Sequence, residues 1–221
     1  MAASPAPKRR VAVMISGRGS NMMALVAAAR DGAYPAEIVG VVSNRPEAAG
    51  FGWAKSQGLP AKAIDHTAHA TREAFEGELQ SYLRDVRAEL VCLAGFMRLL
   101  TAPFVEKWSG RMLNIHPSLL PAFPGLDTHE RALAAGVKIS GCTVHYVVPQ
   151  MDAGPIIAQA AVAVADGDTR ESLAARILEA EHRLYPVALS LVSEGTVRLE
   201  GGRAIMSSGV YQPGTLFSPP L

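Results

Sequence analysis

The chain has 221 residues, of which 49% are hydrophobic and 19% charged, and its formal net charge at pH 7 is +1. This length fits one domain around one core, and the composition argues against a largely disordered chain. With no basic surplus to follow a phosphate backbone, we expect no nucleic-acid partner. Cys92 and Cys142 lie in apolar runs, which favours free buried thiols over a disulfide framework or a metal cage.

The two ends of the sequence read as tails around a single domain. No apolar stretch reaches the ~18 residues that span a bilayer, so we expect no membrane contact. Residues 1–10 lack the apolar region of a secretory signal and are expected to be disordered, which indicates a cytoplasmic protein. The domain is expected over 11–206, followed by a peripheral tail, rich in proline and glycine, over 207–221.

The first half alternates short β-branched runs with helical patterns. Strands are expected at 11–16, 37–43, 61–65, 90–95 and 111–115. Helices are expected at 21–30, 48–58, 71–88 and 101–110. Strands that are apolar throughout and separated by helices are typical of βαβ units, in which helices cover both faces of a parallel sheet.

The second half has a different rhythm. A helix is expected at 128–136, and two strands at 140–148 and 155–165 have so short a connection that they should pair antiparallel. A helix is expected from Asp168 to about Ser193, with Glu171 completing a capping box. Two short strands, TVRLE and RAIMS, follow it. The predicted fold is a three-layer αβα domain with a mostly parallel, open twisted sheet and an antiparallel C-terminal part.

The segment ISGRGSN at 15–21 joins the first strand to the first helix. Gly17 and Gly19 permit a tight turn, and Ser20 and Asn21 are common at helix starts. Backbone N–H groups at such a helix start suit a phosphate. A dinucleotide fingerprint would need a third glycine and an acid after the second strand, and a P-loop would need Gly-Lys-Ser/Thr. Since neither is present, we predict a monophosphate site; a glycine-rich turn without a ligand is the alternative.

The run MLNIH ends with two polar side chains, Asn114 and His116, on the same side of a strand. An amide N–H can hold a developing oxyanion while an imidazole moves a proton, which suits carbonyl chemistry. A capped strand end with a structural histidine is the alternative. Asp152 lies in the turn between the two later strands, where it is either a turn residue or a carboxylate that favours a protonated His116.

Two further observations concern acids and metals. In the last long helix, Glu181 falls within the apolar arc, so its carboxylate should either pair internally or face a ligand. The six histidines show no HExxH motif or other tight ligand spacing, and we expect no metal site.

Six segments in this order resemble the phosphoribosylglycinamide (GAR) formyltransferases and together cover roughly residues 11–200. These segments are ISGRGSN (15–21), TREAF (71–75), LAGFMRLL (93–100), LNIHPSLLPAFPG (113–125), MDAGPII (151–157) and EAEHRLYP (179–186). NIHPSLLP with a downstream DxG is specific for folate-dependent formyl transfer, and GxGSN narrows the resemblance toward the GAR enzyme.

The resemblance implies transfer of formyl from 10-formyltetrahydrofolate to the amine of GAR, in purine biosynthesis, by a monomer or homodimer. It implies a catalytic set of Asn114, His116 and Asp152. It implies GAR contacts at Gly17, Arg18, Gly19, Ser20, Asn21 and Glu181. It implies a folate site lined by Arg72, Met97, Arg98, Leu99, Leu100 and Asn114.

Two positions depart from the family pattern: Arg18 stands where small or amide residues are common, and Asp127 where GLHTH is expected. Segment 118–130 is a candidate lid. Related activities remain as alternatives. A methionyl-tRNA formyltransferase would add an RNA-binding domain, and a formyltetrahydrofolate deformylase an N-terminal regulatory domain. A non-enzymatic nucleotide-binding module would explain the glycine turn but leave the catalytic set without a role.

Overall fold

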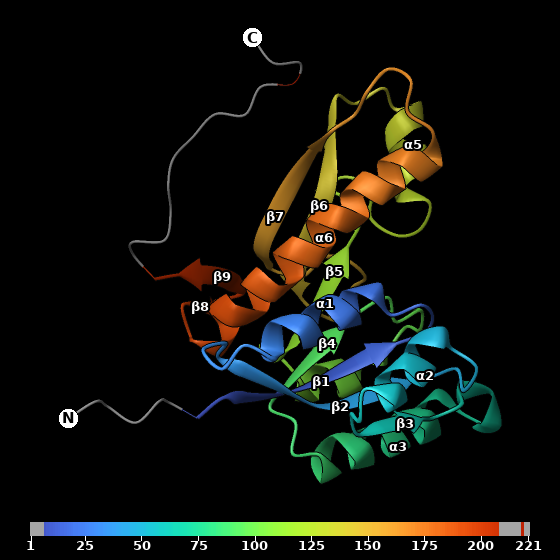
Figure 1. Cartoon of the computed structure of the whole chain (residues 1–221), viewed down its shortest axis with the longest axis vertical. Coiled ribbons are helices and arrows are strands. Elements are labelled where there is room, and N and C mark those ends of the chain that lie inside the picture. The colour runs from blue at the N-terminus through green and yellow to red at the C-terminus, as the bar shows by residue number, and fades with distance from the viewer. Residues whose placement is uncertain (1–6, 208–217, 219–221) are drawn as a thin grey trace.

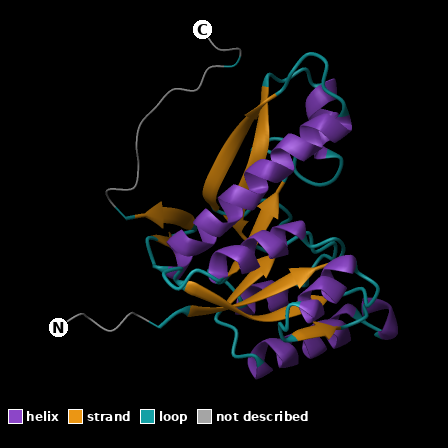
Figure 2. Ribbon diagram, viewed as in Figure 1, coloured by secondary structure: helices purple, strands orange, loops and turns teal. Residues whose placement is uncertain are grey.

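The computed structural model describes residues 7–207 and 218, and a seven-stranded sheet lies at its centre (Figures 1 and 2). The strand order is β3-β2-β1-β4-β5-β6-β7. The strands are β1 (Arg9–Ile15), β2 (Ala36–Ser43), β3 (Ala61–Ala63), β4 (Leu90–Leu93), β5 (Met112–His116), β6 (Ile139–Tyr146) and β7 (Ile156–Ala163). Pairs among β1 to β5 are parallel, whereas β6 pairs antiparallel with β5 and with β7. The predicted fold class is confirmed.

Helices cover both faces of this sheet. One face carries α1 (Ser20–Ala29), α2 (Ala49–Ser56) and the long α6 (Arg170–Ser193), and the other carries α3 (Arg72–Asp85) and α4 (Ala102–Lys107). Figure 1 shows α1 and α6 side by side on the viewer's side of the sheet, with α5 (Thr128–Ala134) near the start of α6. A 3₁₀ turn at His66–Ala68 precedes α3. None of the helices within residues 7–207 is long and apolar enough to cross a membrane.

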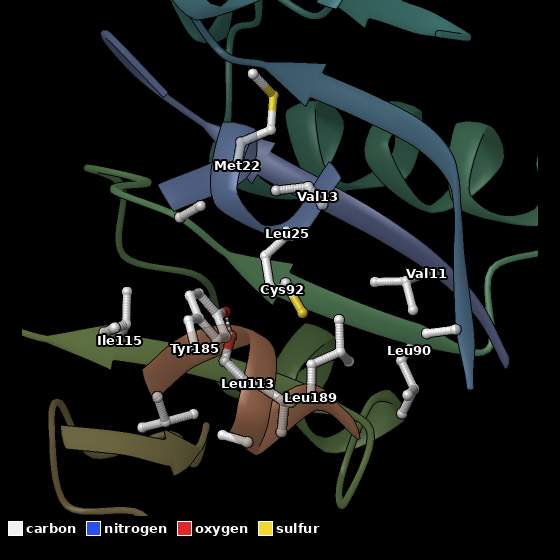
Figure 3. Packing of buried hydrophobic residues seen from close by; sticks show 14 of the residues in the cluster. Val11, Val13, Met22, Leu25, Leu90, Cys92, Leu113, Ile115, Tyr185 and Leu189 are labelled. Carbon is white, nitrogen blue, oxygen red and sulfur yellow. Dashed lines mark hydrogen bonds between the residues drawn. The ribbon is translucent and has the colours of Figure 1, made fainter. Parts of the chain in front are cut away.

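Tyr185 of α6 fixes this helix over the two strands that lead to the candidate site. Its ring is fully buried among Cys92, Leu113 and their neighbours (Figure 3). Its hydroxyl lies 3.2 Å from the carbonyl oxygen of Leu93 at the end of β4 and 3.1 Å from that of Leu113 in β5. Because this buried polar group is satisfied, α6 has a defined position relative to both strands.

Several predicted boundaries are corrected. β1 begins at Arg9, two residues before the predicted start, because Arg9 and Arg10 pair with the start of β2, and Glu89 also binds the Arg9 side chain and the Arg10 backbone. The predicted capping box of α6 was wrong: Thr169 is the N-cap and Ser172 its partner. Asp168 is unavailable for that role because Arg176 and the Ser172 hydroxyl bind its carboxylate.

The last two strands, β8 (Val197–Glu200) and β9 (Arg203–Met206), form a separate antiparallel hairpin. Of the two predicted tails, residues 1–6, 208–217 and 219–221 lie outside the described residues.

Candidate active site

The predicted site residues gather at one edge of the sheet. β1, β4 and β5 run parallel, so their carboxyl ends meet at the same edge. The chain moves from β1 out to β3 and then returns to the other side of β1 with β4. Open α/β sheets bind ligands at such a reversal of strand order.

Ser16 joins the loops that follow β1 and β4. Its hydroxyl donates to Asn44 Oδ1 at 2.5 Å and accepts the N–H of Met97 at 2.7 Å. Its own N–H donates to the carbonyl of Gly95 at 3.2 Å. Sequence reasoning did not single out Ser16, although it lies within the ISGRGSN motif. The predicted phosphate loop and the first part of the predicted folate loop are therefore held together.

The glycine turn before α1 is shaped by Gly19, which is the N-cap in a left-handed conformation, with φ of 73°. A Cβ there would lie 3.2 Å from Cα of Gly50. Ser20 begins the helix, and no side chain caps it. The N–H groups of the first turn have no intrahelical partners, and the helix dipole favours negative charge at this end. Arg18, which is exposed, adds a full positive charge to the loop.

Asn21 and Glu181 form a buried pair between α1 and α6. Asn21 Nδ2 donates to Glu181 Oε2 at 2.6 Å. Burial raises the pKa of Glu181 to about 7, and the Asn21 hydrogen bond offsets this only in part. Asn21 Oδ1 is buried without a hydrogen-bond partner among the described residues. An unsatisfied amide oxygen beside a destabilised acid indicates a binding site for a polar ligand.

The predicted catalytic side chains converge beyond β5. His116 is buried, and its Nδ1 lies 3.5 Å from Asp152 Oδ2. Its Nε2 lies 3.0 Å from the carbonyl oxygen of Phe123, which can only accept, so Nε2 carries a hydrogen. Asp152 has a φ of 53° and accepts the N–H of Gly125 at 2.8 Å. The turn before β7 thus places the Asp152 carboxylate beside the His116 imidazole, and the same carboxylate holds Gly125 of the candidate lid.

His145 is a fourth member of this cluster that sequence reasoning missed. It lies opposite Asn114 in the β5–β6 register and is only 2% exposed. Its Nε2 lies 3.2 Å from Asn114 Nδ2 and 3.9 Å from Asp152 Oδ1, and its Nδ1 lies 2.9 Å from the carbonyl oxygen of Tyr146. The sequence signal was the placement of Thr143 and His145 two residues apart, on one face of a largely apolar strand.

The start of the candidate lid is bound to β6 and β7. Thr143 lies opposite His116; its hydroxyl donates to Ser118 O at 2.7 Å and accepts the N–H of Leu120 at 3.0 Å. Gln159 donates to the Leu120 carbonyl at 2.9 Å. These bonds fix the chain as it leaves the catalytic strand.

Two arginines that the resemblance assigned to the folate site share one hollow at the start of α3. This hollow has a volume of about 300 Å³ and is lined by His66, His69, Ala70, Thr71, Arg72, Phe75 and Arg98. Arg72 and Arg98 are exposed, which leaves their charge available to an anion. Beside Arg98, Met97 and Leu99 are 67% and 62% exposed, while Leu100 packs against the apolar cluster under α3. Exposed apolar side chains next to cations suit a ligand with a flat ring and an acidic tail.

Comparisons with known proteins show the family to which the chain belongs. The formyl transferase family model matches residues 9–189. The trifunctional purine biosynthetic protein adenosine-3 of Bos taurus is 51% identical over 89% of this chain, which spans only 20% of that protein's length. The phosphoribosylglycinamide formyltransferase of Escherichia coli is 38% identical, over 88% of this chain and 92% of that protein.

Solved structures show the same similarity. Glycinamide ribonucleotide transformylase 1 of Symbiobacterium toebii has a TM-score of 0.87 and 46% identity, covering 90% of this chain and 94% of that one. A formyltetrahydrofolate deformylase of Pseudomonas putida has a TM-score of 0.83 and 29% identity, covering 93% of this chain and 72% of that one. The family match and the near full-length relatives lead to one conclusion: this chain belongs to the formyl transferase family.

Proposed function

We propose that the protein transfers the formyl group of 10-formyltetrahydrofolate to the amine of GAR, giving formylglycinamide ribonucleotide and tetrahydrofolate. The observation that carries this proposal is the convergence of Asn114, His116 and Asp152 at the same sheet edge as the α1 anion cradle. The relatives named for this activity support it.

The chemistry follows from these side chains. The amine of GAR attacks the formyl carbon and forms a tetrahedral centre with a negative oxygen. The N–H groups of Asn114 and His116 stabilise that oxygen. In this structure the Phe123 carbonyl oxygen accepts the hydrogen bond from His116 Nε2 that the substrate oxygen would accept during the reaction. Asp152 stabilises the protonated imidazole and orders a water that takes the proton from the attacking nitrogen. That proton passes to the folate nitrogen as its bond to the formyl carbon breaks.

GAR binding is assigned to the α1 side of the site. The loop Gly17–Asn21 holds the phosphate through backbone N–H groups, with Arg18 supplying charge. Glu181 accepts hydrogen bonds from the ribose hydroxyls, which its burial beside Asn21 supports. A binding site that keeps a carboxylate buried is stabilised when a ligand provides donors to it.

Folate binding is assigned to the opposite side. Arg72 and Arg98 bind the carboxylates of the glutamate tail, and Met97, Leu99 and Leu100 contact the apolar part of the molecule. No metal takes part in this scheme. We further propose a cytoplasmic location, and a monomer or a homodimer that binds only small molecules.

The deformylase alternative differs only in its acceptor, which is water. It gives no role to the buried Glu181 or to the cradle at α1, whereas GAR transfer uses both. A nucleotide-binding module gives no role to Asn114, His116 and Asp152. Incubation with 10-formyltetrahydrofolate and either GAR, methionyl-tRNA or water alone, followed by identification of the formylated product, separates these functions. Formylated GAR supports the proposal, and formate release at the same rate without GAR contradicts it.

A further inference from the structure

His145 lies behind the catalytic amide, and its two ring nitrogens have different partners. Nδ1 lies 2.9 Å from the backbone carbonyl of Tyr146. A carbonyl oxygen can only accept a hydrogen bond, so Nδ1 carries a hydrogen. Nε2 lies 3.2 Å from the side-chain amide of Asn114. In a neutral ring, Nε2 then carries a lone pair instead of a hydrogen, and it needs a hydrogen-bond donor as its partner.

The surroundings of His145 favour the neutral ring. The side chain is 2% exposed, and burial is the main cause that lowers the pKa of His145. Nearby His116 lowers this pKa further, whereas the Tyr146 carbonyl and the Asp152 carboxylate raise it by smaller amounts. The Asp152 oxygen is 3.9 Å from Nε2, too far for a hydrogen bond. The contact between His145 Nδ1 and the Tyr146 carbonyl requires a glycine at position 154. Any side chain there would collide with this pair, because a Cβ would lie 1.7 Å from the Tyr146 oxygen and 3.2 Å from His145 Nδ1.

Resting on the function proposed above, we propose that His145 is a positioning residue that sets which end of the Asn114 amide faces the formyl group. Its Nε2 lone pair accepts one hydrogen of the Asn114 NH₂ group and repels the amide oxygen. The amide therefore has one orientation, in which the second N–H of the same nitrogen is free for the substrate oxygen. Without this acceptor, the amide can rotate by half a turn and present its oxygen to the developing negative charge.

The first test reads the ring directly and does not depend on activity. Two-bond ¹H–¹⁵N correlation spectra of the ¹⁵N-labelled protein at neutral pH should show His145 with a protonated Nδ1 and an unprotonated Nε2. A ring protonated at Nε2, alone or together with Nδ1, would overturn the proposal. This result stands even if GAR proves not to be the acceptor, so the two proposals can fail separately.

The second test uses substitutions. His145→Phe fills the space but removes the acceptor, and should lower kcat about 10²-fold with little change in either KM, as expected for a misaligned oxyanion donor. His145→Gln, whose side-chain oxygen can accept from Asn114, should recover most of this loss. Tyr82→Phe is the control, since Tyr82 is buried in the apolar cluster under α3 and its hydroxyl donates to the carbonyl of Pro60; it should leave kcat unchanged.

A double-mutant cycle identifies the route of the effect. In an Asn114→Ala background, His145→Phe should lower kcat by less than about threefold, because there is no amide left to orient. A loss as large as in the wild-type background would mean that His145 acts independently of Asn114, and the proposal would be wrong. Thermal unfolding of each variant, measured alongside, identifies any that fail to fold; the tautomer measurement on the wild type then decides.

Discussion

The two halves of the candidate site are built differently. The side proposed to bind GAR uses the backbone of one βα turn, Gly17–Asn21, with a single buried acid opposite. The side proposed to carry out catalysis uses side chains from β5, from β6 and from the turn before β7, with contacts of 3.2 Å between Asn114 and His145 and 3.5 Å between His116 and Asp152. A local turn needs only the right residues in sequence, whereas the catalytic cluster needs the register of an antiparallel strand pair. Damage to the first should affect binding, and damage to the second should affect the chemical step.

The largest effect is expected on the catalytic side. Asn114→Ala and Asp152→Ala should each lower kcat by about 10² or more, because removal of an oxyanion donor typically costs about 10²–10³ and positioned acid–base groups contribute about 10²–10⁴. The KM values should change little. Steady-state kinetics with both substrates varied gives the answer. A large rise in the KM for GAR with kcat intact would place these residues on the binding side.

Glu181→Gln should weaken binding on the GAR side. The loss of a charged hydrogen bond to a ribose hydroxyl should raise the KM for GAR by about tenfold to a hundredfold, with a smaller change in kcat. The KM for the folate substrate should not change, and the kinetic comparison of both substrates provides this control. Equal effects on the two KM values would contradict the assignment of Glu181 to GAR binding.

The same substitution should stabilise the fold at high pH. The pKa of Glu181 is raised from 4.5 to about 7, so the folded state binds the proton more tightly than the unfolded state. This contribution to stability is full below about pH 4.5 and is lost as pH rises through 7, and the loss reaches about 3 kcal/mol. Glu181→Gln lacks this loss, so its advantage over wild type in urea unfolding should be larger at pH 8 than at pH 5. An advantage that does not depend on pH would contradict the buried-acid account.

Gly19→Val tests the backbone cradle. Gly19 has a positive φ, which is unfavourable for a β-branched residue, and a valine side chain there would collide with Gly50. The turn should therefore distort. The KM for GAR should rise about tenfold, and the KM for folate much less. Gly32→Val is the control, because a Cβ there meets nothing within 4 Å. A loss shared equally by both substrates would indicate that the loop only supports the fold.

The smallest expected effect is that of metal removal. Exhaustive chelation should leave the activity equal to that of the untreated protein within experimental error, because amide and imidazole groups polarise the formyl group in the proposed mechanism. Within the described residues, no group of three or more His, Cys, Asp and Glu side chains is placed to hold a metal ion. Activity that disappears on chelation and returns with zinc would refute this part of the mechanism.

Much of the fold was predictable because its signals are local. Apolar runs separated by helices predicted the parallel strands, and the period of two placed Asn114 and His116 on one face. The helical arc predicted that Glu181 is buried, although not that Asn21 is its partner.

The rest depended on tertiary contacts. The chain between β5 and β6 is too long to be a tight hairpin, so no turn type fixed the register that brings His145 opposite Asn114. Ser16 likewise gained its role only through Met97 and Asn44, which are distant in sequence. The start of α6 was misplaced because Arg176, two turns into the helix, engages Asp168.

The most direct test of the account is a double-mutant cycle on His116 and Asp152, which lie 3.5 Å apart. His116→Ala and Asp152→Ala should each lower kcat for formyl transfer to GAR by about 10² or more. Because the two side chains act as one unit, the double variant should lose much less than the product of the two single losses. Strictly multiplicative losses would show that Asp152 acts independently of His116, and the catalytic pairing proposed for this site would be wrong.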